Sequence, residues 1–293
     1  MVSGLPEPSN AAVGSLPELA DTNVVLQGIT VQVADKSQFD ASIAFFQDAF
    51  DFKILRQRIR GTIEESWLGY GPEQLSIPPG FEIPVSSFAE YGGHASICLS
   101  YDSRINTPLY RTGDPAPGDN IAFVQLGVPG YRISQMVKNG GNVLDAYGIV
   151  NVVAPCGLPV RGIVGYSPDP IMFVAINCAD VKASKAFYEQ LGFAEQEYPY
   201  ARPSKGTGQF EPPQPPKSVY MAPSPNSLGV LLLQAKKRKS IAPNPVVQSL
   251  NLVYTPADGD DGSGSVPMVS DPSGTSVAFQ SLASFEDMEK QTR

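Results

Sequence analysis

The sequence predicts an α+β fold built from a β-α-β-β-β unit that recurs along the chain. Of its 293 residues, 42% are hydrophobic and 17% are charged, which is the composition of a globular protein with about two domains. Strand and helix signals follow one another in the same order more than once. The clearest repeat joins residues 31–52 and 175–193, each with a strand, an Ala-Asp pair and a helix with paired aromatic residues.

The first unit shows each of its elements in turn. Asp35, Ser37 and Asp40 are plausible N-cap residues, and Phe46 and Phe50 recur at helical spacing after them. Apolar and β-branched residues indicate the strands. Strands are expected at 24–33, 52–59, 64–71 and 94–102.

The later units repeat this order with losses. The second has a strand at 120–128 and a short helix at 131–138, which Gly140 and Gly141 end. The third starts with a strand that ends at Asp180. The last has strands around a Gly/Asp loop and no room for a full helix. We therefore expect an N-terminal arm at 1–23, a domain at 24–170, a second domain at 171–284 and a polar tail at 285–293.

One such unit cannot bury both faces of its sheet, so two units are expected to pair and enclose a curved sheet around a pocket. Two Pro-rich segments, from Pro78 to Gly93 and from Pro199 to Lys217, offer large contact surfaces beside it.

Charge and cysteine content exclude several classes of protein. A net charge of −8 argues against binding to duplex nucleic acid or to an anionic membrane, since both need basic patches. No apolar run reaches the ~18 residues that span a bilayer. Three widely spaced cysteines form neither a disulfide framework nor a zinc ribbon, and they suit a reducing compartment. Cytoplasm and plastid stroma both fit, and the N-terminus lacks a secretory signal.

Several motifs carry a resemblance to a known family. ILRQRI followed by EESWLGYGPE, the strand HASICLSYD, and the turns YSPDP and SDPSG are similar to the glyoxalase I branch of the vicinal-oxygen-chelate superfamily. The long four-unit plant form fits best, from Val24 to Leu282. The resemblance implies a glyoxalase-like fold of βαβββ modules that form curved mixed sheets. It also implies a divalent metal held by a Gln or His on the first strand of a module and a Glu on its last strand.

At these ligand positions, the residues of this chain differ from the family pattern. Counting along the motifs places these residues there: Gly28 and Cys98, then Ile121 and Val174, then Phe173 and Leu231 or Leu232, and finally Ala278 or Phe279. Apolar side chains cannot coordinate a metal. A shift of one residue would bring Gln27 to the first position, because neighbouring strand residues face opposite sides.

A histidine, a cysteine, two glutamates and two aromatic residues of the first unit are further site candidates. His94 and Cys98 stand four residues apart on one strand, about 13 Å, which is too far for a nucleophile pair. Of Glu64 and Glu65, one should face solvent. Trp67 and Tyr70 suit either the core or a cleft.

The sequence therefore predicts no catalytic, cofactor-binding or metal-binding residue. If a metal is bound after all, the nearest candidates are Gln27, Glu64, Glu65 and His94. Residues that could line a cleft are Trp67, Tyr70, Cys98 and Phe173.

We expect a non-catalytic glyoxalase-like protein that serves as a structural subunit, with protein partners or self-association. Binding of a small apolar ligand between modules is a second possibility within this class. The alternative from another class is a metal-dependent lyase of the glyoxalase I type (lactoylglutathione lyase), or a related dioxygenase, with Zn, Ni or Fe.

Overall fold

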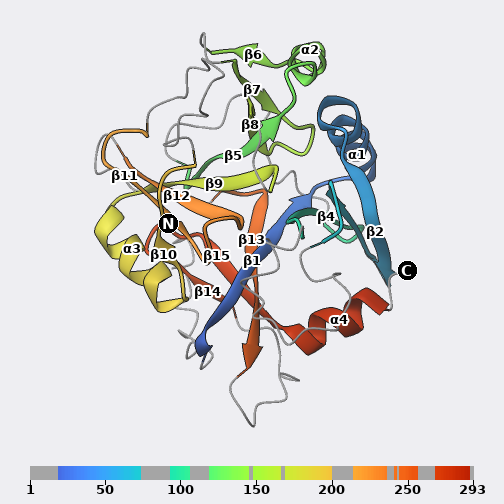
Figure 1. Cartoon of the computed structure of the whole chain (residues 1–293). Helices are drawn as coiled ribbons and strands as arrows, with labels where there is room; N and C mark the ends of the chain where they lie inside the picture. The colour runs from blue at the N-terminus through green and yellow to red at the C-terminus, as the bar shows by residue number, and fades with distance from the viewer. Residues whose placement is uncertain are drawn as a thin grey trace, which may run out of the picture.

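A computed structural model describes residues 19–73, 93–105, 119–144, 148–165, 169–199, 214–235, 241–242, 244–256 and 268–290. Two mixed sheets and four helices make up this part of the chain (Figure 1), which confirms the α+β class. Most of each Pro-rich segment lies outside the described residues, as does the arm before Leu19.

The first sheet has seven strands in the order β14-β15-β13-β1-β4-β3-β2. Its strands are β1 (Leu19–Val33), β2 (Lys53–Arg60), β3 (Ile63–Gly69), β4 (Ser96–Asp102), β13 (Val247–Pro256), β14 (Met268–Ser270) and β15 (Ser276–Ser281). β1 already includes residues 19–23, which the sequence had assigned to the arm, because Leu19 pairs with Pro256 on β13.

The second sheet has eight strands in the order β10-β11-β12-β9-β5-β8-β7-β6. Its strands are β5 (Ile121–Val128), β6 (Asn142–Val143), β7 (Ile149–Val153), β8 (Pro159–Val164), β9 (Ile171–Cys178), β10 (Ala194–Glu195), β11 (Ser218–Ala222) and β12 (Gly229–Gln234). β8 and β9 are separate strands, so the count that placed Val174 on the last strand of the second module is wrong. Val174 belongs to β9, the first strand of the third module.

Four helices accompany the strands: α1 (Lys36–Phe50), α2 (Arg132–Lys138), α3 (Val181–Gln190) and α4 (Leu282–Lys290). The side chain of Asp35 caps α1 by accepting from the Gln38 backbone N–H at 2.9 Å, and Asp180 caps α3 in the same way. α4 differs from the prediction, because it occupies most of the segment at 285–293 that was expected to be a polar tail.

The modules pair in a crossed order. In each module the last strand lies parallel to the first, as β4 does to β1 and β8 does to β5. The first strands of two modules then pair antiparallel, β1 with β13 and β5 with β9. The first module therefore shares a sheet with the fourth, and the second with the third. Neither sheet is built from 24–170 alone or from 171–284 alone, and that division of the chain stays a prediction.

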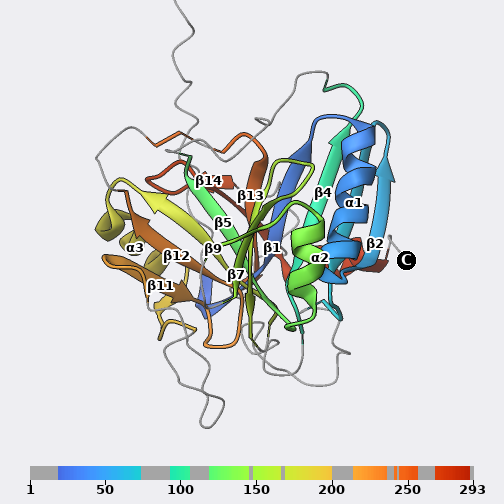
Figure 2. The same ribbon diagram turned by 90° about the horizontal axis from the view of Figure 1, so that it is seen from above.

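One continuous apolar cluster contains side chains from both sheets and from α1, α2 and α3. Phe46 of α1 stacks on Phe52 with ring centroids 5.4 Å apart. α1 and α2 lie side by side (Figure 2), and Arg132 of α2 pairs with Asp51 at 3.0 Å. This shared core covers the helix-bearing face of the seven-stranded sheet.

Candidate functional site

The face of the seven-stranded sheet opposite α1, here called the inner face, carries most of the polar residues. On β1, Leu26 and Ile29 both point to the shared core, because an irregularity in the pairing with β13 places one extra residue between Leu26 and Gly28. Gln27 therefore lies on the inner face. Gly28 cannot carry a ligand there, since a Cβ would lie 2.2 Å from the Ser96 carbonyl oxygen.

Four buried polar residues of this face form a cluster around one carboxylate, the Glu73 cluster: Gln27, Arg56, Glu73 and Ser96. Oε1 of Glu73 accepts from Gln27 Nε2 at 2.8 Å and from Ser96 Oγ at 2.9 Å. Arg56 Nε lies 2.9 Å from Oε2, and the two side chains are only 3% and 4% exposed. The segment after β3 is thus joined to β2 by a charged pair that is removed from water, and to β1 by a hydrogen bond.

The guanidinium of Arg56 lies between two aromatic rings. Its central carbon is 4.1 Å from the centroid of the Trp67 ring and 4.8 Å from that of Phe285 on α4. Phe285 is 1% exposed and packs with Val25 and Val253, which also belong to the inner face. α4 therefore covers part of this face, and a cation–π contact joins it to the Glu73 cluster.

Toward the edge of the same face, Arg58 and Glu65 form a second ion pair. Arg58 Nε donates to Glu65 Oε2 at 2.7 Å, with side chains 13% and 16% exposed. Arg58 also lies over Trp67 at 5.2 Å. This pair has the chemistry of the Arg56–Glu73 pair but is less buried.

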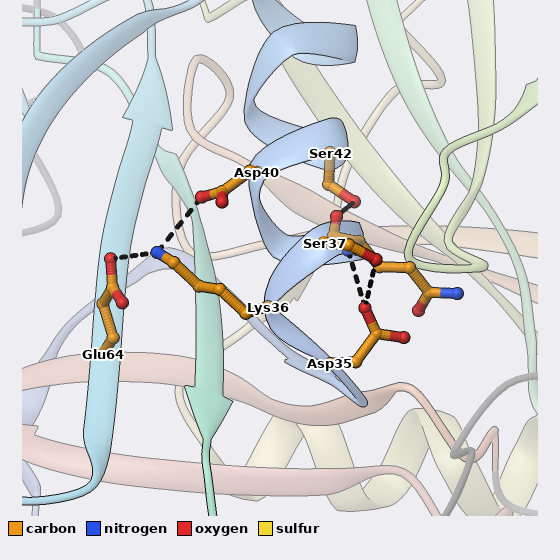
Figure 3. A network of polar contacts seen from close by, with 7 residues as sticks. Asp35, Lys36, Ser37, Asp40, Ser42 and Glu64 are labelled. Carbon is orange, nitrogen blue, oxygen red and sulfur yellow. Dashed lines mark hydrogen bonds and ion pairs between the residues drawn. The ribbon is translucent and has the colours of Figure 1, made fainter.

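Of the four metal candidates from the sequence, only Gln27 belongs to the Glu73 cluster, where it bonds Glu73 and Ser96. Glu64 points to the other face, where it accepts from Lys36 of α1 at 2.7 Å, and Lys36 also pairs with Asp40 (Figure 3). Glu65 is engaged by Arg58, and the Nδ1 atom of His94 lies 3.2 Å from the carbonyl oxygen of Gly71. Within the described ranges, no group of three or more His, Cys, Asp or Glu side chains could hold a metal ion.

The other cleft candidates lie in three places. Trp67 and Cys98 stand opposite each other on β3 and β4, both on the inner face. Tyr70 lies on the α1 side, where its hydroxyl donates to the carbonyl oxygen of Phe50 at 2.8 Å. Phe173 belongs to the eight-stranded sheet, where it packs in an aromatic cluster with Phe123, Tyr198 and Tyr220.

A buried carboxylate connects the two sheets. Oδ2 of Asp169 accepts from the backbone N–H of Ala95, next to β4, and Oδ1 accepts from that of Ile171 on β9. Burial raises the pKa of Asp169 to about 6, against the opposing effects of the Ala95 bond and of the nearby His94 charge.

Comparison with solved structures identifies the fold. Glyoxalase I from Zea mays superposes with a TM-score of 0.64 at 14% identity, over 90% of this chain and 95% of that chain. A substituted form of the same enzyme gives a TM-score of 0.64 at 15% identity, over 90% and 96% of the two chains. The chain has a vicinal-oxygen-chelate fold. The sequence matches no protein-family model and no curated protein sequence.

The donor set does not fit the divalent metal that a vicinal-oxygen-chelate enzyme of the glyoxalase I type implies. Gln27 uses its amide N–H groups on Glu73 and Ser96, and a guanidinium already lies against the carboxylate. At the last-strand position, burial raises the pKa of the Cys98 thiol well above its usual range. Cys98 therefore offers a buried thiol at a position where the family pattern has a carboxylate.

Three residues of this site were not anticipated from the sequence: Arg56, Glu73 and Phe285. Glu73 closes the LGYGPE motif, so the family resemblance alone marked its position. Arg56 lies in a strand whose alternation of apolar and basic residues predicts one basic face. Leu282, Phe285 and Met288 stand at helical spacing, which is the signal that could have found α4.

No helix in the described part of the chain is long and apolar enough to cross a membrane.

Proposed function

We propose that this protein is a non-catalytic member of the vicinal-oxygen-chelate fold and serves as a structural or complex subunit. The Glu73 cluster carries the proposal. At the position where the family has a metal ligand on its first strand, this chain has a buried salt bridge and two buried hydrogen bonds from neutral donors to the same carboxylate. The amide nitrogen of Gln27, the hydroxyl of Ser96 and the carboxylate of Glu73 are bonded within the cluster, and Arg56 lies against Phe285 of α4.

The eight-stranded sheet also supports a non-catalytic function. Its corresponding face is filled by the rings of Phe123, Phe173, Tyr198 and Tyr220. Ring centroids around Phe173 lie 5.9 to 6.2 Å apart, which is the spacing of aromatic rings in contact. Binding of a small apolar ligand at this aromatic cluster is the second possible role of a non-catalytic protein.

Exposed apolar residues on edge strands support an assembly role. Ile59 on β2 is 73% exposed, and Val143 on β6 and Met268 on β14 are each 58% exposed. All three strands lie at an edge of their sheet. Edge strands with exposed apolar side chains are prone to pair with other chains, so a partner or a second copy would cover them. The buried, unpaired cysteines suit the cytoplasm or the plastid stroma, where we place this role.

The alternative is a metal-dependent lyase, and one observation favours it. Gln27 lies on the inner face within hydrogen-bond distance of Glu73, so a Gln and a Glu, the ligand types of the family, do meet there. This alternative requires the Arg56 guanidinium to leave Glu73.

Three measurements on one purified, tag-free sample separate the two functions: metal content by elemental analysis, mass by size-exclusion light scattering, and turnover of the hemithioacetal of methylglyoxal and glutathione. The proposal expects metal well below one ion per chain, no turnover, and a defined mass above that of the 31.3 kDa chain. Stoichiometric metal with turnover would establish the lyase instead. A strictly monomeric chain without turnover would refute the assembly role and leave ligand binding.

A further inference from the structure

We propose that the Glu73 cluster is a metal-independent centre in which Arg56 is a built-in cation, with Glu73 as its counter-ion and α4 as its cover. The proposal rests on the proposed non-catalytic function and names the residue that supplies the positive charge at this site. The resulting site is closed, neutral in charge and independent of metal.

The first support is the direction of the hydrogen bonds. Gln27, Ser96 and Arg56 come from three strands, β1, β4 and β2, and all donate to or pair with the one carboxylate of Glu73. A metal site needs the reverse arrangement, in which several oxygen atoms face one cation. Here several donors face one anion, so the centre of the site is negative and its cation stands at the side.

The second support is burial. A buried carboxylate without a counter-charge is strongly destabilising, and an unpaired buried guanidinium is equally so. Both charges of the Arg56–Glu73 pair are almost fully removed from water, and Arg56 approaches both carboxylate oxygens, with Nε at 2.9 Å and a terminal nitrogen at 3.3 Å. Arginine suits this place because its planar group can contact two oxygens at once and remains charged at any physiological pH.

The third support is the position of the guanidinium between Trp67 and Phe285. Both rings lie within 5 Å of its central carbon, so Arg56 is held from the sheet on one side and from α4 on the other. A compact metal ion offers no such planar surface to two rings. The cation and the cover of the site therefore stabilise each other.

The chain offers a matched control whose arginine lies on the same strand, β2. Arg58 and Glu65 form an ion pair on the same face, and Arg58 lies over the same Trp67 ring at 5.2 Å. This pair is more exposed than the Arg56–Glu73 pair, so water stabilises either charge when the other is removed.

The test is a pair of double-mutant cycles in urea. One uses Arg56→Met, Glu73→Gln and both together, and the other uses Arg58→Met, Glu65→Gln and both together. In the first cycle we expect each single substitution to lower the urea midpoint markedly and the double variant to lose much less than the sum. In the second cycle we expect small losses that nearly add. Alongside, the native chain is melted with EDTA and with Ni²⁺ or Zn²⁺, and we expect the same midpoint in all three.

Each outcome decides the matter. Losses that add fully in the first cycle would overturn the role of Arg56 while leaving the non-catalytic function intact. If the single variants do not fold and the double variant does, the coupling is established more strongly. If none of the three folds, the native melts decide: an unchanged midpoint supports the built-in cation. A midpoint that falls with EDTA or rises with Ni²⁺ would overturn it, and turnover in the same sample would overturn the proposed function as well.

Discussion

Removing the Phe285 ring tests whether α4 covers the inner face. Phe285 is 1% exposed, and truncation of a buried Phe to Ala costs about 3–5 kcal/mol. Its apolar cluster is small, with Val25 and Val253 as the other fully buried members, so we take the lower end, about 3 kcal/mol. The lost contact with Arg56 adds about 1 kcal/mol. Phe285→Ala should therefore lower the free energy of unfolding by about 4 kcal/mol.

The assay is urea unfolding followed by the emission of Trp67, which is the only tryptophan in the chain. Trp67 stacks on the same guanidinium as Phe285, so a loosened α4 should also shift its emission to longer wavelength before any urea is added. Phe285→Leu is the matched variant, because it keeps most of the apolar volume and should cost about 1–2 kcal/mol. Ala283→Ser, on the exposed side of α4, should change little. A Phe285→Ala chain within about 1 kcal/mol of the native one, with unchanged emission, would refute the packing of α4 on the inner face.

Three further substitutions test the scaffold. Gly28→Ala should lower the free energy of unfolding in urea by about 3 kcal/mol, because its Cβ would meet the Ser96 backbone. Gly61→Ala has open space around the new Cβ but a φ of +58°, so it should cost about 1 kcal/mol. Equal losses would contradict the close approach at Gly28. Asp180→Ala should lower the stability by about 1 kcal/mol and Asp180→Ser should restore most of it, and a neutral Ala variant would show that the cap is not needed. Burial raises the pKa of Asp169 from 3.8 to about 6, so the folded state holds this proton more tightly than the unfolded state does. The buried charge of Asp169 therefore does not destabilise the native chain below about pH 4 and destabilises it fully above about pH 6. The difference in free energy of unfolding between the native chain and Asp169→Ala should shrink as pH rises through this window. A difference that grows instead would show that the folded-state pKa of Asp169 is not raised.

The positions of the functional residues illustrate the limit of counting along a sequence. The count along the motif placed Gly28 at the ligand position, and the one-residue shift that would bring in Gln27 was foreseen as an alternative. The irregularity in the β1–β13 pairing is what turns Gln27 to the inner face. β13 begins more than two hundred residues later, so no local pattern around Gln27 could show it.

The sequence by itself determined the elements and their order, because the signals involved are local. Strand alternation, helical spacing and the caps at Asp35 and Asp180 each depend on a few neighbouring residues, and they led to the correct fold class. The tertiary structure decided which modules share a sheet, what Arg56 pairs with and what covers it. Gln27 and Glu73 lie 46 residues apart, and Phe285 reaches Arg56 from the other end of the chain. Such contacts arise only when β1 pairs with β13 and brings α4 over the inner face, because the free energy that fixes them comes from burial across the whole sheet.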